Sequence, residues 1–313
     1  MFTIYVFCCC ARSCFGIPKY FAFYDDIPAE TMSFTNLRLS VSASESVFTK
    51  ALGLDSLLLV EDIFFSTSNR GMNPNWEQEW HDFLPQAKAL ISNQSIIGFN
   101  LGDELVNNCI PLDNVTSAAN AVRKQFPRRS GPPPRGEHAI IWYNEAAGPV
   151  RLNISDKCGQ KSTGPFVIPR ALDWFSIDKY HMNGQTENWV NKNVKAFYEQ
   201  YIYPRLSGNQ RVVLVPGSFG SNVNHFPNGT YVCDKDCYDR MCSYDANDFY
   251  TWAKDPASKV EVIAPWNWSG CKSCNGSHWT PPHTCCMDEI GTKDQPKSRE
   301  VWERIGSEIK QMR

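Results

Sequence analysis

The sequence lacks an excess of charge of either sign. Its 313 residues include 31 Lys and Arg against 33 Asp and Glu, which gives a formal net charge of −2. The basic residues are not concentrated in one face or tail, so nucleic acid is not expected as the main partner. The same balance removes a strong electrostatic reason to bind anionic membranes.

A long apolar segment is also missing. No stretch reaches the ~18 uncharged apolar residues typical of a transmembrane helix, so we expect no membrane span. The short apolar run from Met1 to Ala11 resembles the core of a signal peptide, although it lacks a basic start. We therefore interpret residues 1–16 as a signal-like or irregular N-terminus and expect a single domain over residues 17–313.

Motifs of several enzyme classes are absent as well. There is no P-loop and no dinucleotide fingerprint, and Gly217-Ser218-Phe219-Gly220 does not fit the Gly-X-Ser-X-Gly nucleophile elbow. Only six His are present, and no His-X-His follows the first predicted strand. These absences disfavour a serine hydrolase and a metal-dependent barrel hydrolase, and we expect neither a cofactor nor a metal.

Cysteine, by contrast, is abundant. The chain has 13 cysteines and six Asn-X-Ser/Thr sequons, at Asn93, Asn114, Asn153, Asn228, Asn267 and Asn275. Together they favour an oxidising secretory route, so we expect a secreted, disulfide-bonded glycoprotein. An odd number of cysteines leaves at least one thiol free or paired with another chain. Cys-X2-Cys with nearby His can also bind zinc, but the sequons favour disulfides in the loops after the seventh and eighth strands, at Cys233, Cys237, Cys242, Cys271, Cys274, Cys285 and Cys286.

Eight short apolar runs recur along the chain, and each ends in polar or acidic residues. Such runs are typical of parallel strands that are buried on both faces. Strand followed by helix, repeated, predicts an α/β fold, a (β/α)8 TIM-type barrel, and the length suits one barrel of roughly 250 residues plus loops. The predicted strands are Lys19 to Tyr24, Leu37 to Val41, Ser56 to Val60, Ser95 to Gly102, Ala139 to Tyr143, Trp174 to Ile177, Val212 to Val215 and Val260 to Ala264. Stretches at helical spacing include Trp76 to Ile91, Asn114 to Phe126, Trp189 to Leu206, Asp245 to Lys254 and Ser298 to Met312.

Two places depart from the repeat. The step from Tyr24 to Leu37 is too short for a full crossover helix, since a parallel crossover needs a dozen or more residues. We therefore predict a degenerate first unit. The segment from Ala147 to Arg170 shows no clear helical pattern and is predicted to be a long loop.

Acidic residues gather at the ends of the predicted strands. In barrels of this kind the catalytic groups come from the C-terminal strand ends, and crowded, buried carboxylates suit general acid/base chemistry. Glycoside hydrolysis typically uses such carboxylates as a pair. An Asp at a strand end also often caps the next helix, so a structural role is equally expected for the first four of these residues. The set is Asp25, Asp26, Glu61, Asp62, Asp103, Glu104, Glu145 and Asp178.

The pair Asp103-Glu104 is the strongest candidate for function. The preceding Gly102 indicates close backbone packing, and the next helix is predicted to start near Asp113, too far on for Glu104 to cap it. The common barrel glycosidases with glutamates on strands four and seven fit less well, because the seventh predicted strand ends in Pro216-Gly217-Ser218 without an acid.

A family resemblance rests on the segment Phe99-Asn100-Leu101-Gly102-Asp103-Glu104-Leu105. It resembles the strand-four Gly-Asp-Glu motif of family 20 β-N-acetylhexosaminidases and, more loosely, the paired acids of chitinase-like barrels, although no His-X-Gly-Gly stands before it. The resemblance implies that Glu104 is the general acid and that Asp103 orients the acetamido group of the substrate, which acts as nucleophile. It also implies that Asp178 and Tyr180 contact the acetamido group and that Trp266 or Trp268 forms the floor of the subsite.

The sequence therefore leaves two alternative functions open. The first is a secreted glycoside hydrolase that acts on oligo- or polysaccharides, N-acetylhexosamine glycans among them, with Asp103, Glu145 or Asp178 as the second carboxylate. In this hypothesis Glu145 and Asp25 are further candidates for substrate contact. The second is a catalytically silent barrel that binds glycans through Trp266 and Trp268. The oligomeric state and the disulfide connectivity do not follow from the sequence.

Overall fold

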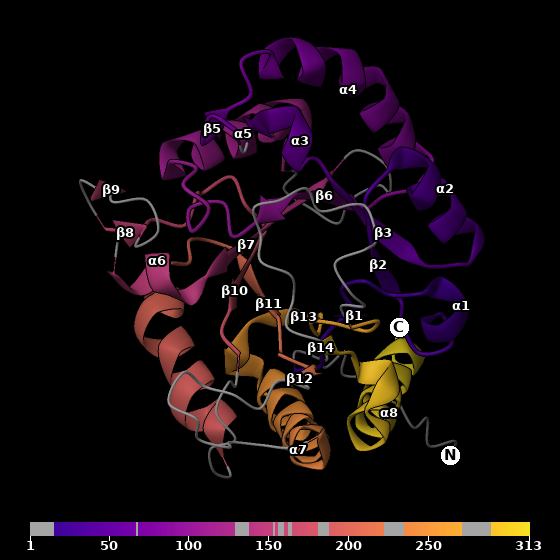
Figure 1. Cartoon of the computed structure of the whole chain (residues 1–313). Coiled ribbons are helices and arrows are strands. Elements are labelled where there is room, and N and C mark those ends of the chain that lie inside the picture. Colours follow the sequence, from indigo (N-terminus) through magenta and orange to yellow (C-terminus); the bar gives the residue numbers. More distant parts are fainter. Residues whose placement is uncertain are drawn as a thin grey trace, which may run out of the picture.

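The structure is a (β/α)8 barrel, seen down its axis in Figure 1. It is a computed structural model that describes residues 16–66, 68–128, 138–152, 154–155, 160–161, 165–180, 188–221, 235–270 and 289–313. Eight strands form one parallel sheet in the order β1-β13-β11-β10-β7-β6-β3-β2. Their bounds are β1 Tyr20–Phe21, β2 Leu37–Ser40, β3 Asp55–Leu59, β6 Gly98–Asp103, β7 Ile140–Ala146, β10 Trp174–Asp178, β11 Arg211–Leu214 and β13 Val260–Ile263. The predicted fold class and all eight predicted strands are thus confirmed.

The barrel closes between β1 and β2 without a backbone ladder. Asn36, directly before β2, joins the two strands instead: its Oδ1 accepts from the backbone N–H of Phe21 at 2.8 Å, and its Nδ2 donates to the carbonyl of Lys19 at 3.1 Å. The backbone N–H of Asn36 donates to the Phe21 carbonyl at 3.1 Å. A side-chain amide therefore takes the place of a peptide group at the seam, the line between β1 and β2 where the barrel closes.

Two separate apolar clusters explain why the strands are apolar at nearly every position. One cluster fills the barrel interior with alternate strand residues, among them Tyr20, Ala22 and Tyr24 from the first strand. The larger cluster lies between the sheet and the helices and takes the intervening residues, such as Phe21 and Phe23. Each strand is therefore buried on both faces.

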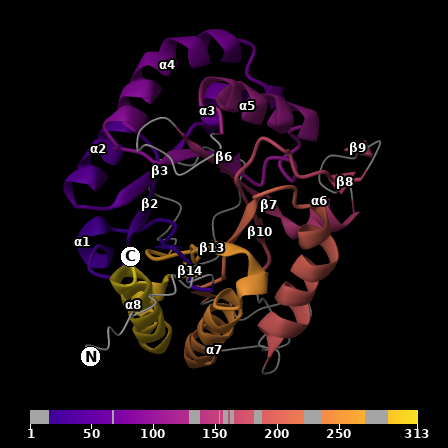
Figure 2. The same ribbon diagram turned by 180° about the vertical axis from the view of Figure 1, so that it is seen from behind.

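Helices surround the sheet on the outside, and the reverse view in Figure 2 shows the same ring. The predicted helices at α4, α5 and α8 are confirmed, whereas α7 begins ten residues earlier than its expected start at Asp245. The segment expected as one helix over 189–206 is helical from residue 189 to residue 205, as predicted. It contains π-type turns at Val190–Lys195 and Tyr198–Ile202 and ends in a 3-10 turn at Tyr203–Arg205. The α-helices are α1 Pro28–Thr31, α2 Ala43–Ala51, α3 Glu61–Phe64, α4 Trp76–Ser92, α5 Leu112–Gln125, α6 Ala147–Leu152, α7 Lys235–Ala253 and α8 Pro296–Gln311.

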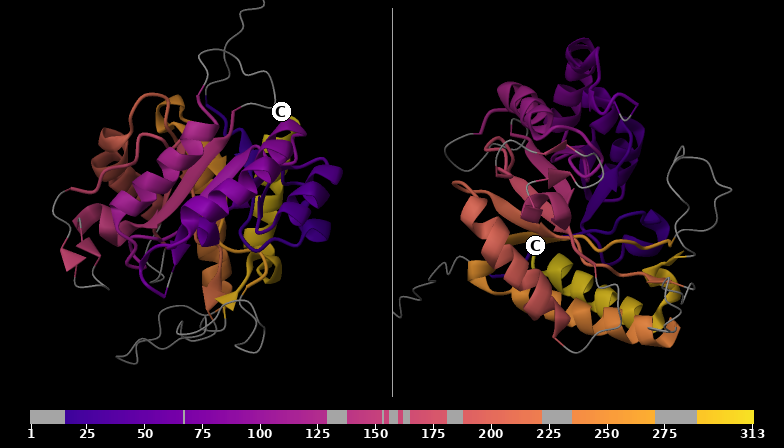
Figure 3. Two further views of the ribbon diagram at one scale, coloured as in Figure 1. Left: turned by 90° about the horizontal axis from the view of Figure 1, so that it is seen from above. Right: turned by 60° about the vertical axis from the view of Figure 1, so that its left-hand side comes forward.

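The last two helices pack side by side, as Figures 1 and 3 show. No side chain within α8 caps its N-terminus. Asp239 of α7 does so instead, because its two carboxylate oxygens accept the backbone N–H groups of Lys297 at 3.1 Å and Ser298 at 2.8 Å. A carboxylate at a helix N-terminus satisfies free N–H groups and interacts favourably with the helix dipole, so this contact fixes how α8 docks on α7.

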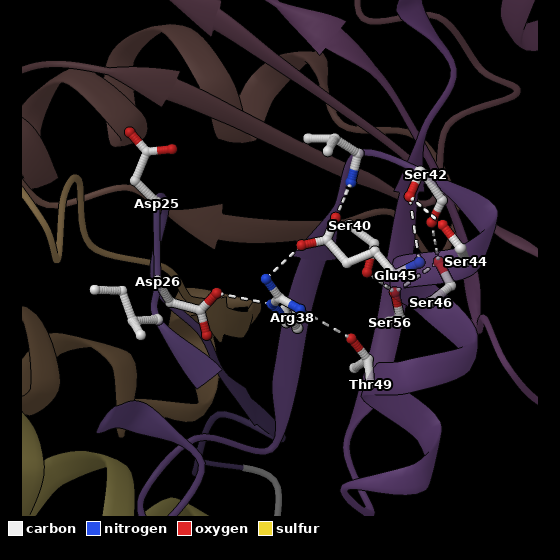
Figure 4. Close-up of polar contacts among 12 residues, drawn as sticks. Asp25, Asp26, Arg38, Ser40, Ser42, Ser44, Glu45, Ser46, Thr49 and Ser56 are labelled. Carbon is white, nitrogen blue, oxygen red and sulfur yellow. Dashed lines mark hydrogen bonds and ion pairs between the residues drawn. The ribbon is translucent and has the colours of Figure 1, made fainter. Parts of the chain in front are cut away.

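The first unit is degenerate, as predicted: α1 is a single turn between β1 and β2. A buried ion-pair network, drawn in Figure 4, supports it. Arg38 of β2 donates from Nε to Asp26 Oδ1 at 2.9 Å and also pairs with Glu45 of α2. Asp26 in addition accepts from the Thr31 hydroxyl at 2.8 Å. The structural interpretation of Asp26 is therefore correct, while Figure 4 shows the Asp25 carboxylate turned away from this network.

The remaining short strands lie outside the barrel sheet. β4 Phe65–Ser66 pairs with β5 Gly71–Met72, β8 Ile154–Ser155 with β9 Gln160–Lys161, and β12 Gly220–Ser221 with β14 Glu289–Ile290, all antiparallel. The helix α6 and the hairpin β8–β9 occupy the segment that was predicted to be a plain loop. Among the described residues, no helix is long and apolar enough to cross a membrane.

Candidate active site

The ends of four neighbouring strands, β3, β6, β7 and β10, bring acidic and amide side chains together at one rim of the barrel. The register of the sheet aligns them, since Asp103 pairs with Asn144 and Ser176 lies opposite Asn144 from the other side. Parallel strands end at the same edge, so residues far apart in sequence become neighbours here.

Asn144 of β7 lies between two carboxylates. Its Nδ2 donates to Asp103 Oδ1 at 2.6 Å and to Asp178 Oδ2 at 2.8 Å. Its Oδ1 accepts from the hydroxyl of Ser176 at 2.6 Å, and that hydroxyl accepts from Trp142 Nε1 at 2.9 Å. The Trp142 indole can only donate, so this chain fixes the direction of the amide. Asp103 and Asp178 are therefore held on either side of one N–H2 group.

Burial, with nearby negative charge, raises the pKa values of both carboxyl groups. Burial raises the pKa of Asp103 to about 6, and the nearby charge of Glu104 adds to this, while the hydrogen bond from Asn144 lowers it. Burial followed by the charge of Asp103 raises the pKa of Asp178 well above its usual range. The pair accordingly holds a proton near neutral pH, with one carboxyl able to donate a hydrogen bond and the other able to accept one.

Two buried oxygens near this pair have no hydrogen-bond partner within the described part of the chain. They are Asp178 Oδ1 and the Tyr24 hydroxyl. The Tyr24 ring packs against Trp142 at 5.9 Å and Trp266 at 5.1 Å between centroids. Buried polar atoms are normally paired, so these two are available to a bound polar molecule. The hydroxyl of Tyr180, a predicted contact residue, also interacts with Asp178 and partly offsets the rise of the Asp178 pKa.

Glu104 follows the strand in an unusual backbone conformation. Its φ is +47°, in the left-handed region that non-glycine residues rarely adopt. Its backbone N–H donates to the Asn144 carbonyl at 3.0 Å, and its Oε2 accepts from Asn107 Nδ2 at 2.7 Å. The helix α5 begins at Leu112, so Glu104 is not its cap, as the sequence predicted.

Glu61 contacts this segment from the end of β3. Its Oε2 accepts the backbone N–H of Asp103 at 3.2 Å. It also lies against Gly102, whose φ is +147° and where an added Cβ would approach Glu61 Oε2 to 2.7 Å. The predicted close packing at Gly102 is therefore present. Burial, together with the charge of Asp103, raises the pKa of Glu61 to about 7, so this acid belongs to the same electrostatic group.

Two sequence-derived site residues lie elsewhere than expected. Trp268 is fully buried, donates its indole N–H to Glu30 Oε2 at 2.6 Å and packs on Phe23, so it is a core residue and not a subsite floor. Glu145 is fully buried on the other face of β7, where its oxygens bind protein N–H and O–H groups, so it presents no free surface to a substrate. Asp25 is exposed, and its expected contact with substrate stays a prediction. Of the two tryptophans, only Trp266 is partly exposed beside Tyr24.

Sequence reasoning did not single out Asn144, Asn107 or Tyr24. Asn144 carries a detectable signal, because it is the polar residue at the end of the fifth predicted strand. The other two carry none that distinguishes them from loop or core residues.

Ser218, at the end of the seventh strand region, is not an exposed nucleophile. It is fully buried, and its hydroxyl lies 2.6 Å from that of Thr292 and accepts from Trp302 Nε1 at 2.8 Å. The hydroxyl cluster joins the strand end to α8 and its preceding turn. Ser218 is therefore a structural residue.

The cysteine predictions are only partly within the described residues. Cys109 and Cys237 are disulfide-bonded. The expectation that Cys242 lies in a disulfide-bonded loop is wrong, because it is a buried free thiol within α7, as the odd cysteine count allows. The predicted disulfide loops at Cys233, Cys271, Cys274, Cys285 and Cys286 lie outside the described residues.

Comparisons with known proteins address the fold. The sequence matches no protein-family model, and no curated protein matches it in sequence. Among solved structures it is similar to Saccharomyces cerevisiae Gas2p in complex with laminaritetraose and laminaripentaose, with a TM-score of 0.50 and 11% identity over 90% of this chain and 57% of that chain. It also matches a GH113 beta-1,4-mannanase at a TM-score of 0.47 and 12% identity, over 96% of this chain and 99% of that chain.

These matches have a limited meaning. At such low identity the likeness to Gas2p shows the barrel fold alone, in agreement with the strand order. The chain spans less than two thirds of the length of the Gas2p chain. The resemblance to family 20 rests on the Gly102-Asp103-Glu104 motif, and the comparisons do not support it.

Proposed function

We propose that the protein is a glycoside hydrolase in which Glu104 is the proton donor. The observation that carries the proposal is the pair Asp103 and Asp178, held on either side of the Asn144 amide next to Glu104. Glycosidases need carboxyl groups whose environments separate their protonation states, because one group must donate a proton while another bears or orients charge. Burial and mutual repulsion at this rim provide that separation.

Glu104 and Asp103 have different roles in the proposed reaction. Glu104 gives its proton to the glycosidic oxygen as the bond from that oxygen to the anomeric carbon breaks. The acetamido oxygen of the same sugar forms a bond to the anomeric carbon, and the Asp103 carboxylate accepts a hydrogen bond from the acetamido N–H. Water then attacks the anomeric carbon, its proton passes to the Glu104 carboxylate, and the acetamido group is restored. The enzyme thus ends in its starting protonation state.

The proposed substrate is a glycan that contains N-acetylhexosamine. The strand-four motif supports this choice, and so do the free oxygens of Asp178 and Tyr24, which are placed to bind a polar substituent of a sugar. The partly exposed ring of Trp266 beside Tyr24 supplies an apolar surface of the kind on which sugar rings pack. The sequons and cysteines support action in the secretory pathway or outside the cell.

A screen on 4-nitrophenyl glycosides tests the proposal. The panel contains β-linked N-acetylglucosaminide, N-acetylgalactosaminide, glucoside and mannoside, and the variants are Glu104→Gln and the exposed-helix control Glu300→Gln. On this panel we expect turnover of an N-acetylhexosaminide. Because 4-nitrophenolate leaves with little help from an acid, the variants are then compared on the methyl glycoside of the same sugar, whose leaving group needs protonation. On that substrate we expect a loss of 10²- to 10⁴-fold in Glu104→Gln and no loss in the control. Undiminished hydrolysis in Glu104→Gln would refute the role of Glu104. Saturable oligosaccharide binding without turnover would favour the silent glycan-binding barrel instead.

A further inference from the structure

Glu145 has no part in the chemistry described above, yet it is a fully buried acid next to Asn144 in β7. Successive residues of a strand point to opposite faces. Asn144 faces Asp103 and Asp178, whereas Glu145 faces the segment that follows Glu104. The two neighbours therefore contact the acidic pair and the proton donor from different sides.

Four donors surround the Glu145 carboxylate. Oε2 accepts the backbone N–H of Val106 at 2.9 Å and the Tyr143 hydroxyl, and Oε1 accepts the backbone N–H groups of Asn107 at 3.2 Å and Ala146 at 2.8 Å. Each oxygen thus accepts two hydrogen bonds from the protein, and these bonds partly offset the burial that raises the pKa of Glu145 to about 8. Two of the four donors belong to the residues directly after Leu105, which ties this segment to β7.

The same segment carries Glu104. Its strained backbone conformation persists only where surrounding contacts impose it. The Asn144 carbonyl holds the backbone N–H of Glu104, and Glu145 holds the backbone two and three residues later. Asn107, whose backbone Glu145 holds, in turn donates its side-chain amide to Glu104 Oε2 at 2.7 Å. One buried carboxylate thus fixes the residue that orients the proton donor.

We propose that Glu145 is a positioning residue for Glu104, which acts by anchoring the Val106–Asn107 backbone so that Asn107 aims the Glu104 carboxyl. The proposal rests on the proposed function of Glu104 as acid. It differs from a general packing role, because an anchor of the acid alters only the proton-transfer part of the reaction. A displacement of about 1 Å at a catalytic group costs on the order of 10²-fold in rate.

Substrates with different leaving groups distinguish a positioning role of Glu145 from a general packing role. A 2,4-dinitrophenyl glycoside departs with little help from an acid, whereas a sugar or methyl leaving group needs protonation. The test variant is Glu145→Gln, which keeps the volume of the side chain but places an N–H2 group against N–H donors. The control is again Glu300→Gln, an equivalent substitution at an exposed position of α8.

We expect kcat/KM of Glu145→Gln to fall about 10²-fold on the unactivated substrate and less than threefold on the 2,4-dinitrophenyl glycoside. The ratio kcat/KM is compared because it reports cleavage of the glycosidic bond and excludes the later step in which Glu104 receives the proton of water. An equal loss on the two substrates, or no loss on either, would overturn the positioning role.

A second measurement judges the inference independently of turnover. Amide hydrogen exchange followed by mass spectrometry reports on the peptide that contains residues 104–110. We expect at least tenfold faster exchange there in Glu145→Gln, with the barrel strands and α8 unchanged. Unchanged exchange in this peptide, or faster exchange throughout the protein, would overturn the inference. If the wild-type protein hydrolyses no glycoside, the proposed function fails, and the exchange result still decides whether Glu145 anchors the segment.

Discussion

Replacing Asn144 by Ala removes the single group that separates Asp103 from Asp178. Both carboxylates lose a hydrogen-bond donor that lowers their pKa, so both pKa values are expected to rise further. The Ser176 hydroxyl also loses its acceptor. A hydrogen bond to a charged group contributes about 1.5–3 kcal/mol and one to a neutral group about 0.5–1.5 kcal/mol, and one of each kind is lost here because the pair holds a proton near neutral pH. We therefore expect the free energy of unfolding to fall by about 2–4 kcal/mol.

The pH dependence gives the sharper test. In the proposed mechanism the Asp103 carboxylate accepts the acetamido N–H, so activity requires its ionised form. Because the pKa of Asp103 is about 6 in the native site, the acidic limb of kcat/KM is expected near that pH. In Asn144→Ala the limb moves to higher pH. Carbon-13 detected titration of Asp side chains measures the same shift without substrate, and urea denaturation measures the stability.

Two outcomes would refute this reasoning. One is an acidic limb at the wild-type position in Asn144→Ala together with unchanged Asp titrations, since Asn144 would then not control the protonation of the pair. The other is a stability equal to that of wild type, which would mean that the buried hydrogen bonds contribute nothing. Glu300→Gln serves as the control for both measurements.

Three further predictions concern neighbouring residues. Burial raises the pKa of Glu61 from 4.5 to about 7, so its contribution to stability is complete at low pH and is lost as the pH rises through 7. The free energy of unfolding of the wild type is therefore expected to fall by at most about 3 kcal/mol between about pH 4.5 and pH 7, and Glu61→Gln should remove this fall, as measured by urea denaturation at each pH. Gly102→Ala should cost about 1–3 kcal/mol of stability because of its positive φ and the contact with Glu61, and a neutral result would contradict the close packing. Trp268→Ala should lower the free energy of unfolding by about 3–5 kcal/mol, because Trp268 is a core residue. Trp266→Ala should instead weaken oligosaccharide binding about tenfold in calorimetry. The reverse pattern would contradict the assignment of Trp268 to the core and of Trp266 to the mouth of the barrel.

The sequence predicted the barrel well because its strands are buried on both faces. Burial on both faces produces continuous apolar runs, and the weak run at Leu37 is a strand despite the buried Arg38 within it. The start of α7 was missed because its first residues, from Lys235 onward, are polar and include two cysteines. From the sequence alone these residues indicate a disulfide-bonded loop, because their packing against α8 is visible only in the structure.

The site was predicted less completely, for a physical reason. Successive side chains of a strand alternate between its two faces, so the position of a residue within the strand determines the face on which it lies. This alternation stops where the strand ends. Trp266 and Trp268 are two residues apart, yet one lies at the mouth and the other in the core, because the chain leaves β13 after Ile263. Glu145 and Asn144 are adjacent and were both plausible from composition, but only the fold shows which of them faces the acidic pair.

The seam between the first two strands has a consequence for how the barrel is assembled. Elsewhere a ladder of backbone hydrogen bonds sets each strand against its neighbour, so that no one residue determines the alignment. Between β1 and β2 the alignment of the strands depends mainly on individual side chains. These are Asn36 at one end and the Asp26–Arg38 ion pair at the other. Closure of the barrel therefore depends on a few specific side chains, so a substitution at Asn36 is expected to disturb the alignment of β1 and β2 more than a single substitution disturbs any pair of strands joined by a ladder.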